Sequence, residues 1–329
     1  MVSSGEGSIL KNSILYGAFL CLIASISWGA MFPVANHSFQ YIEPFYFTIF
    51  RYIPVAIILV IMLWFKEGKK AFRTEGKGIA LWFFGTMAFT IYNLFIFWGQ
   101  DKMGDSGVLL ASIMESLMPM ISVLILWVIS GIRPKGYNML SIGIAFIGVL
   151  LVITKGDFSS LLSMKSQLIP LIALFASVVG WVLYTMGGSR FSGWSVLRYS
   201  TLTCLYGTVT ATIVVLVTTM FGVIEVPTLA TIDAVKFDLA FMIIFPGLIA
   251  LLGWNVGVSI LKPVNALLFI NFVPITTVVV TFIQGHALTV YDIVGILLVI
   301  AALLLNNIFQ RRKAKERAYK DTRSELQTA

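Results

Sequence analysis

One carboxylate, Glu115, lies in the middle of an apolar segment, whereas the other acidic residues occur in loops, at segment edges or in the terminal segments. A charge at bilayer depth costs about 3 kcal/mol on insertion scales, so it normally faces a polar cavity or a partner. Such a carboxylate can bind a substrate ammonium group or carry a proton that is coupled to transport. Alternatively, it has a structural partner only, such as Arg51 or a hydroxyl. Glu115 is the leading candidate for a functional site.

Arg51, near the outer end of the second apolar segment, is a second candidate. A guanidinium can clamp a substrate carboxylate in a bidentate geometry. The alternative is that the side chain extends to the membrane surface, as arginines near helix ends commonly do. Together with Glu115, Arg51 would offer one charge of each sign to a zwitterion.

The segment that carries Glu115 has polar residues and a proline at spacings of three and four, which place them on one helix face. They are Ser112, Glu115, Ser116, Pro119 and Ser122. The ninth apolar segment repeats the pattern with Asn271, Pro274, Thr277, Thr281 and Gln284. We expect the two faces to line opposite walls of one cavity. The prolines leave backbone carbonyls without a helical partner, and a membrane tolerates such carbonyls only where lipid is excluded. The alternative is that the hydroxyls only bridge helices, at about 1 kcal/mol or less each.

The elements that position these residues are predicted to be membrane helices. Of 329 residues, 58% are hydrophobic and 12% are charged, with a mean hydropathy of +0.93, which exceeds what a soluble core needs. Crossing about 30 Å of hydrocarbon takes about 20 mostly apolar residues. Ten such stretches occur, at approximately 14–35, 45–65, 79–99, 107–130, 138–154, 168–187, 199–221, 239–260, 265–283 and 290–309. The predicted class is an all-α polytopic membrane protein.

The basic residues orient this bundle. If the N-terminus is cytoplasmic, eighteen Lys and Arg residues fall on the inner side and five on the outer side. This asymmetry predicts a plasma-membrane protein with both termini inside, a cytoplasmic N-terminus over residues 1–13 and a basic cytoplasmic tail over 310–329. The net charge of +8 then suits contact with anionic lipid headgroups and does not indicate nucleic-acid binding.

An internal repeat is indicated at an offset of 155 residues. It pairs Gln100 with Asn255, Ala111 with Ala266, Pro119 with Pro274, and Val123 with Val278. Residues 14–154 and 155–309 would then be two five-helix halves. Because five is odd, the second half would enter the membrane inverted, with a site at the midplane between the halves.

The arrangement of these residues resembles the EamA-type repeat of the drug/metabolite transporter superfamily. In the first half the resemblance rests on Trp28, Gly29, Pro44, Arg51, the run from Ala111 to Pro119, Gly143 and Gly148. In the second half it rests on Trp181, Tyr184, the run from Gly253 to Asn255, Pro274, Gly285 and Gly295. The resemblance covers roughly residues 14–309. It implies ten helices, two inverted halves and the export of small molecules.

The resemblance also places the segments that carry several aromatic residues around a central path. They are Trp28, Tyr92, Trp98, Trp181, Tyr184 and Trp254. Such rings can stack on a substrate or surround a cation, although rings of this kind also serve packing alone. The amide of Asn255 is expected either to contact substrate or to join helices.

No sequence pattern indicates an enzyme. The two histidines, His37 and His286, are far apart, and HExxH, GxSxG and GxxxxGK[ST] are absent. We therefore expect a secondary exporter of small metabolites, with amino acids favoured, protons as a candidate coupling ion, no cofactor and no obligate protein partner. A multidrug or organic-cation exporter, or a passive facilitator or channel of the same fold, are the alternatives.

Overall fold

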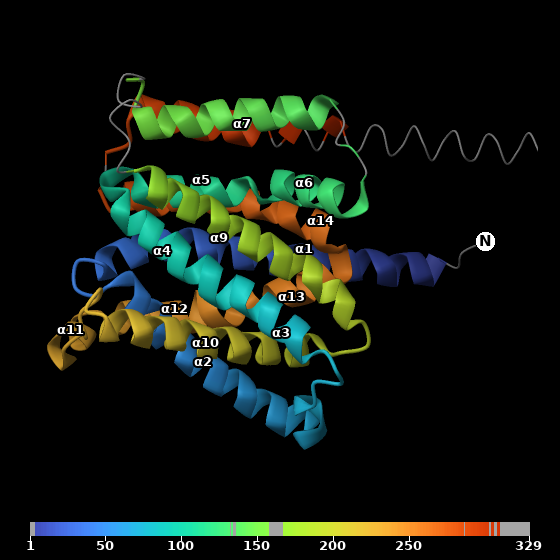
Figure 1. The fold of residues 1–329 in the computed structure, drawn as a ribbon. Coiled ribbons are helices and arrows are strands. Elements are labelled where there is room, and N and C mark those ends of the chain that lie inside the picture. The colour runs from blue at the N-terminus through green and yellow to red at the C-terminus, as the bar shows by residue number, and fades with distance from the viewer. Residues whose placement is uncertain are drawn as a thin grey trace, which may run out of the picture.

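The structure is a computed structural model, and it describes residues 4–131, 133, 136–157, 167–285, 287–302, 304–305 and 308–309. These residues form helices and connecting turns, with no strand among them. The predicted basic tail lies outside the described residues. The helices run roughly parallel and antiparallel to one another, as one bundle (Figure 1).

The first half contains α1 (Ser4–Ser38), α2 (Pro44–Glu67), α3 (Gly78–Gly85), a π-helical segment (Thr86–Tyr92), α4 (Asn93–Lys102), α5 (Gly107–Ser116), α6 (Met118–Ser130) and α7 (Gly136–Thr154). The second half contains α9 (Leu168–Gly187), α10 (Val196–Met220), α11 (Leu229–Ala234), α12 (Lys236–Met242), a π-helical segment (Ile243–Ile249), α13 (Ala250–Leu261), α14 (Pro263–Ala266), a 3-10 segment (Leu267–Asn271), α15 (Phe272–Ile283) and a last helix, Val290–Ala302. Short 3-10 turns occupy Lys69–Phe72, Gly104–Ser106 and Gly188–Phe191.

Seven helices of the described chain are long and apolar enough to cross a membrane, or eight if the bent pair α5 and α6 forms one span. The apolar stretches Met139–Val152 and Val290–Ala302 are shorter. All ten predicted stretches thus contain helix, and the polytopic all-α class is confirmed, but the count of ten spans is not. Helices suit this environment because they satisfy their backbone hydrogen bonds internally.

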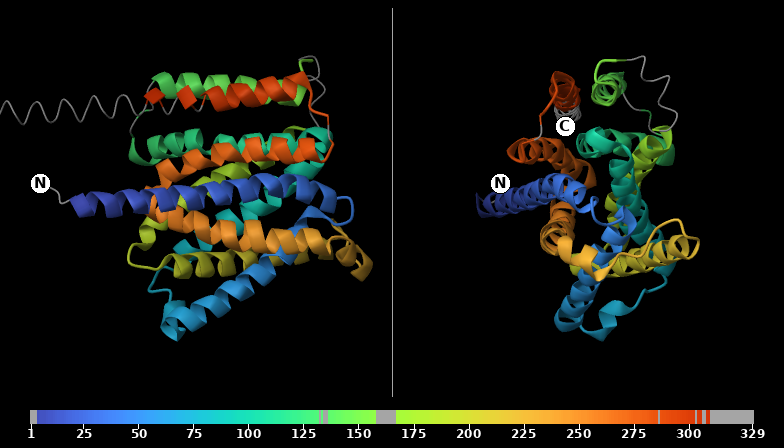
Figure 2. Two further views of the ribbon diagram at one scale, coloured as in Figure 1. Left: turned by 180° about the vertical axis from the view of Figure 1, so that it is seen from behind. Right: turned by 90° about the vertical axis from the view of Figure 1, so that its left-hand side faces the viewer.

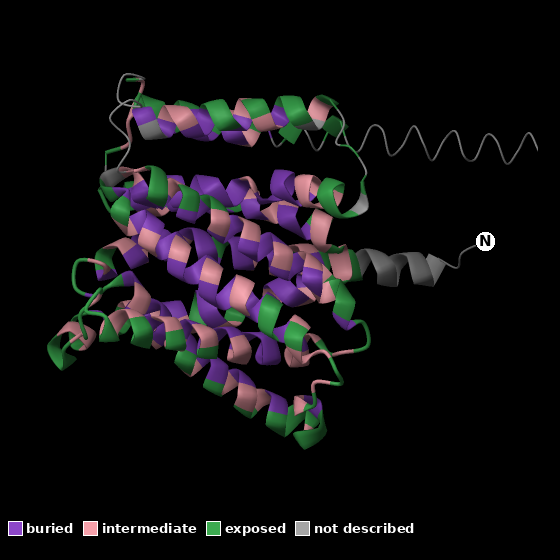
Figure 3. Cartoon of the chain, in the orientation of Figure 1, coloured by how far each residue is buried: buried purple, intermediate pink, exposed green. Residues whose placement is uncertain are grey.

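The two halves interlock. Helix α1 packs against α13 and α15, and α2 packs against α10. Helix α9 packs against α4 and against the π-helical segment Thr86–Tyr92 that precedes α4. Helix α7 and Val290–Ala302 form a layer beside the rest, which Figure 2 shows from two further sides. Buried residues gather on the faces that the helices turn towards one another (Figure 3). Cys21 and Cys204 are both buried and free.

Breaks in the helices recur near the predicted repeat offset. The π-helical segments begin at Thr86 and Ile243. The bend of 47° between α5 and α6 falls at Leu117, and α15 begins at Phe272 after a 3-10 segment. Each of these two breaks lies two residues before a proline, Pro119 or Pro274, which cannot donate a backbone hydrogen bond to the preceding turn. The inverted relation of the halves stays a prediction that these matches support.

Helix α7 and the last helix cross at two glycines. A Cβ atom added to Gly148 would lie 2.6 Å from the carbonyl oxygen of Gly295, and one added to Gly295 would lie 2.6 Å from that of Gly148. The backbones therefore approach as closely as they do because neither residue has a side chain.

We predict that Gly148→Ala forces these helices apart and lowers the melting temperature of the detergent-purified protein, because overpacking typically costs about 1–3 kcal/mol. Gly143→Ala is the matched control on the same helix, since a Cβ atom there meets nothing within 4 Å. Equal melting temperatures for the two variants would contradict the close crossing.

Two loops are joined at the end of the bundle predicted to face the cytoplasm. The Glu75 carboxylate accepts hydrogen bonds from Arg198 Nη2 at 2.7 Å and Trp194 Nε1 at 2.9 Å. The Arg198 guanidinium also lies 3.7 Å from the centre of the Trp194 ring. The hydrogen bonds from Arg198 and Trp194 hold the pKa of Glu75 below its ordinary value of 4.5. This contact is therefore present at neutral pH and is lost as the pH falls through that lowered pKa.

We predict that Glu75→Gln loosens the loop at residues 68–77, because the neutral amide loses the charge-assisted bond to Arg198. Trypsin should then cleave faster at Arg73 and Lys77, as measured by mass spectrometry of the folded protein. Glu225→Gln, in an exposed loop at the opposite end, should leave that rate unchanged. A Glu75 variant cleaved at the parental rate would show that the contact does not order the loop.

Candidate functional site

Glu115 lies in the last turn of α5, directly before the bend at Leu117. Its side chain is fully buried. The hydroxyl of Tyr92, the last residue of the first π-helical segment, donates a hydrogen bond to Glu115 Oε1. Glu115 Oε2 has no partner among the described residues. One oxygen of this buried carboxylate is therefore left without a hydrogen bond by the described chain.

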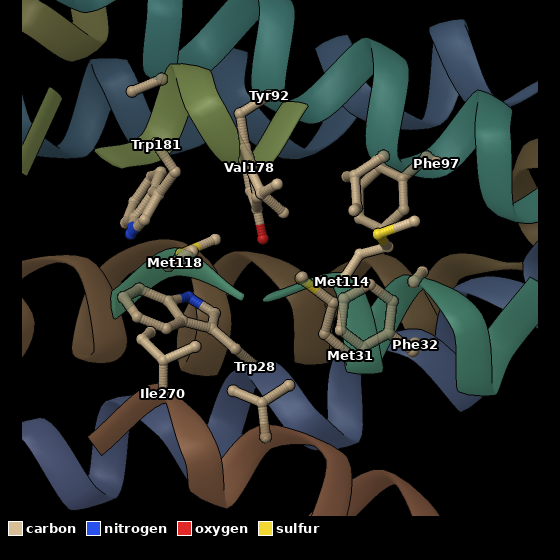
Figure 4. Packing of buried hydrophobic residues seen from close by; sticks show 14 of the residues in the cluster. Trp28, Met31, Phe32, Tyr92, Phe97, Met114, Met118, Val178, Trp181 and Ile270 are labelled. Atoms are coloured by element: carbon tan, nitrogen blue, oxygen red, sulfur yellow. The ribbon is translucent and has the colours of Figure 1, made fainter. Parts of the chain in front are cut away.

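Aromatic rings form a cluster beside this carboxylate, which we call the aromatic cluster: Trp28, Tyr92, Trp181, Tyr184 and Trp254. The ring centres of Trp28 and Trp181 are 5.1 Å apart, those of Tyr92 and Trp181 are 4.9 Å apart, and those of Trp28 and Trp254 are 5.2 Å apart. Figure 4 shows Trp28 and Trp181 on opposing helices, with the Tyr92 hydroxyl to one side of them, pointing into the space between the helices. The indole Nε1 of Trp181 is buried without a partner in the described chain.

Arg51 is buried in α2, with 1% of its surface exposed. Its Nη1 lies 3.4 Å from Asn93 Oδ1 and 3.4 Å from Met31 Sδ. The guanidinium lies 4.6 Å from the centre of the Tyr52 ring, and Nε has no partner among the described residues. The alternative that Arg51 extends to the membrane surface is therefore wrong.

Glu115 and Arg51 do not pair with each other. Within the described chain no ion pair of 4 Å or less joins them. The structural partner considered for Glu115 is thus a hydroxyl, that of Tyr92, and not the arginine. A carboxyl and a guanidinium group are thus both buried in the described core, and each has a polar atom without a partner there.

The two polar faces have mixed roles. Ser112 Oγ donates to the carbonyl of Leu109 in its own helix at 2.7 Å, and Thr277 Oγ1 bridges to the carbonyl of Gly29 at 2.8 Å. By contrast, Ser116 Oγ and Asn271 Oδ1 have no partner in the described part of the chain. Ser116 and Asn271, which the repeat offset pairs, therefore add two further unused polar atoms to the core.

The remaining predicted site residues divide into two groups. Asn255 Nδ2 donates to the Tyr184 hydroxyl at 2.7 Å and to Ser200 Oγ at 2.8 Å, which connects this amide to the aromatic cluster. Trp98 is partly exposed, and among the described residues no ring contact or hydrogen bond connects it to the cluster. Sequence patterns did not single out Ser200 or Tyr52, because neither belongs to a polar stripe; the only indication for Tyr52 is its place beside Arg51.

Two cavities lie at opposite ends of the bundle. The outer cavity, of about 380 Å³, is at the end predicted to face outwards and is lined by Pro33, Asn36, Val108, Leu109, Lys155, Thr281, Gln284, Ala287, Leu288 and Asp292. The inner cavity, of about 300 Å³, is lined by residues that include Trp194, Tyr199, Asn255 and Lys262. Glu115 and the Trp28–Trp181 pair line neither cavity. These central residues are buried and are open to neither of the two cavities.

The described residues contain no group of three or more His, Cys, Asp or Glu side chains that could hold a metal ion. The chemistry of the centre is that of charge, hydrogen bonds and aromatic faces. Such a centre can bind a small polar or cationic molecule.

Comparison with known proteins supplies the family. A family model described as the EamA-like transporter family matches residues 15–154 and again 168–308. The chain is 52% identical over 303 residues to "Uncharacterized transporter YrdR" of Bacillus subtilis (strain 168), covering 92% of this chain and 94% of that protein. It is 28% identical over 282 residues to "Uncharacterized transporter YyaM" of the same organism, covering 85% of this chain and 90% of that protein.

A protein of known crystal structure shares the fold, with a TM-score of 0.64 at 15% identity, covering 92% of this chain and 98% of the other. The family and its named relatives indicate a transporter rather than an enzyme. The apolar helices agree with a multi-pass membrane protein. The chain belongs to the EamA-like transporter family.

Proposed function

We propose that this transporter is a secondary active exporter of small metabolites, with amino acids and related zwitterions as its substrate class. One observation carries the proposal: an acidic and a basic side chain, Glu115 and Arg51, are buried without forming an ion pair, and each keeps an unpartnered polar atom within the described chain. Leaving charged groups unsatisfied is costly. A ligand with an ammonium group and a carboxylate would satisfy both.

The roles of the residues follow from their positions. Glu115 Oε2 would accept from the substrate ammonium, and Arg51 Nε would donate to the substrate carboxylate. Tyr92 orients the carboxylate of Glu115 through its hydroxyl, while Asn93 and Tyr52 position the guanidinium. Trp28 and Trp181 would cover the apolar part of the substrate. Ser116 and Asn271 supply further polar contacts from the two predicted halves.

Alternating access would expose this centre first to one cavity and then to the other, by rocking of the two interlocked halves. We place the protein in the plasma membrane with both termini in the cytoplasm, in accordance with the distribution of Lys and Arg. Glu115 is also the residue that we propose as the carrier of a coupling proton, because it can give up either a proton or a substrate ammonium.

A second candidate function is the export of organic cations. It is favoured by the aromatic cluster next to Glu115, because indole and phenol faces attract cations that lack hydrogen-bond donors. This function would use Glu115, Trp28 and Trp181 and would make no use of Arg51. A passive facilitator or channel of the same fold would instead give flux without saturation or without proton coupling.

We predict that Glu115→Gln raises the half-saturating amino-acid concentration in proteoliposome counterflow about thirtyfold or more. This corresponds to about 2 kcal/mol, the loss expected when one member of a buried charged pair is removed. The assay uses a mixed amino-acid pool at two pH values. If Glu115 carries the coupling proton, the rate of exchange by the variant should also no longer depend on pH. Glu225→Gln is the control. Unchanged exchange in the Glu115 variant would leave that residue with a structural role only.

We further predict that Arg51→Gln separates the two substrate classes. Amino-acid counterflow should weaken by about tenfold or more, because the carboxylate loses a buried charged donor. Competition by a lipophilic cation such as tetraphenylphosphonium should be unaffected by this substitution. Exchange of the cation but not of amino acids by the parent protein would favour the organic-cation exporter.

A further inference from the structure

The outer cavity has the size and lining of a binding site. Its volume of about 380 Å³ lies within the range of about 300–1,000 Å³ that small-molecule sites occupy. Residues from α1, α5, α15 and the last helix all contribute to it. The sequence had placed Thr281 and Gln284 on a polar face, and both side chains line this cavity.

Two buried polar atoms of the lining residues are unused. Asp292 is 2% exposed and Thr281 is 8% exposed. Asp292 Oδ2 accepts from the backbone N of Thr289 at 2.9 Å and from its hydroxyl at 2.7 Å, as a capping box at the start of the last helix. Asp292 Oδ1 and Thr281 Oγ1, however, have no partner within the described chain. Buried polar atoms are normally satisfied, so these two indicate a ligand or water.

Lys155 brings a positive charge to the same cavity. No acidic side chain in the described part of the chain forms an ion pair with it. The backbone holds Lys155 in the left-handed region, with φ of 47°. The next residue, Gly156, lies so close to the Tyr291 ring that a Cβ atom would come within 2.3 Å of it. The turn that carries Lys155 is thus packed against the helix that carries Asp292.

The outer cavity and the central site draw residues from the same helices, α1 and α5. Val108 and Leu109 line the cavity, and the carbonyl of Leu109 accepts the hydroxyl of Ser112, one turn before Glu115. At 1.5 Å per residue, Glu115 lies about 9 Å further along the same helix than Leu109. On the other wall, Thr277 bridges to Gly29, the neighbour of Trp28. The outer cavity therefore lies toward the predicted outer ends of the helices that carry Trp28 and Glu115.

We propose that the outer cavity is a second substrate subsite, which holds a zwitterion with its carboxylate on Lys155 and its ammonium group on Asp292. The subsite repeats the pair of opposite charges found at the centre, and it rests on the proposed function for its substrate class. Unlike the centre, this subsite is open to solvent, because Lys155, which lines it, is exposed. Thr281 and Asn36 add neutral polar groups.

The test is protection of a cysteine placed in the cavity, measured without transport. Gln284→Cys puts an exposed thiol on the cavity wall, and the two natural cysteines are buried. The protein is reconstituted in nanodiscs, so that both faces are accessible whatever the orientation. The rate of labelling by a charged thiol reagent is measured with a pool of neutral amino acids, with choline, or with neither.

Amino acids should slow the labelling severalfold, and choline, which has no carboxylate, should not. Protection should vanish in Lys155→Gln/Gln284→Cys and persist in the control Lys236→Gln/Gln284→Cys, because Lys236 is paired with Asp233 outside the cavity. It should also persist in Glu115→Gln/Gln284→Cys, where the central site is impaired.

Three results would overturn the subsite: no protection by any amino acid, equal protection by choline, or loss of protection when only Glu115 is changed. Failure of the proposed function is detected separately, as absence of amino-acid counterflow by the parent protein. Protection that depends on Lys155 in a protein without such counterflow would retain the subsite and reject the export of amino acids.

Discussion

The centre of the structure depends on the burial of an acidic and a basic side chain that form no ion pair within the described chain. Glu115 and Arg51 are enclosed by apolar helices, and each is held by a neutral group, the Tyr92 hydroxyl in one case and Asn93 in the other. A direct ion pair would cancel both charges and leave the core with nothing to offer a ligand. Keeping them apart requires rigid surroundings, and the interlocked helices and the aromatic cluster provide these.

The helix breaks are part of the same arrangement. Glu115 directly precedes the bend between α5 and α6, and Tyr92 ends a π-helical segment. The second π-helical segment has a related role, because the carbonyl of Pro246 within it accepts the Trp28 indole at 3.3 Å. Irregular backbone is tolerated at membrane depth where protein or a cavity surrounds it. The central residues therefore come from the places where helices depart from regular geometry.

Much of this could be predicted from the sequence, because hydropathy and helical spacing are local properties. The ten apolar stretches, Glu115 and the two polar faces follow from composition and from spacings of three and four. The partners could not be predicted in the same way. Tyr92 binds Glu115 across 23 positions of sequence, Asn255 binds Ser200 across 55, and such contacts depend on how helices pack. The sequence pointed to Trp98 and Trp181 equally as residues of the central path. In the structure, however, Trp98 is partly exposed, whereas Trp181 is buried.

The wide turn at Thr86–Tyr92 also changes how the faces of the third span, Gly78–Lys102, are assigned from the spacing of its residues. A π turn contains more residues than an α turn, so each extra residue rotates whatever follows by about 100° relative to an unbroken α-helix. Gly78–Gly85 and Asn93–Lys102 thus obey two separate helical phases. A periodic pattern fitted across the whole span would assign one of these halves to the wrong neighbours. Substitution data from the two sides of the turn therefore need two separate helical wheels. The residues of the turn itself mark where the helical phase changes.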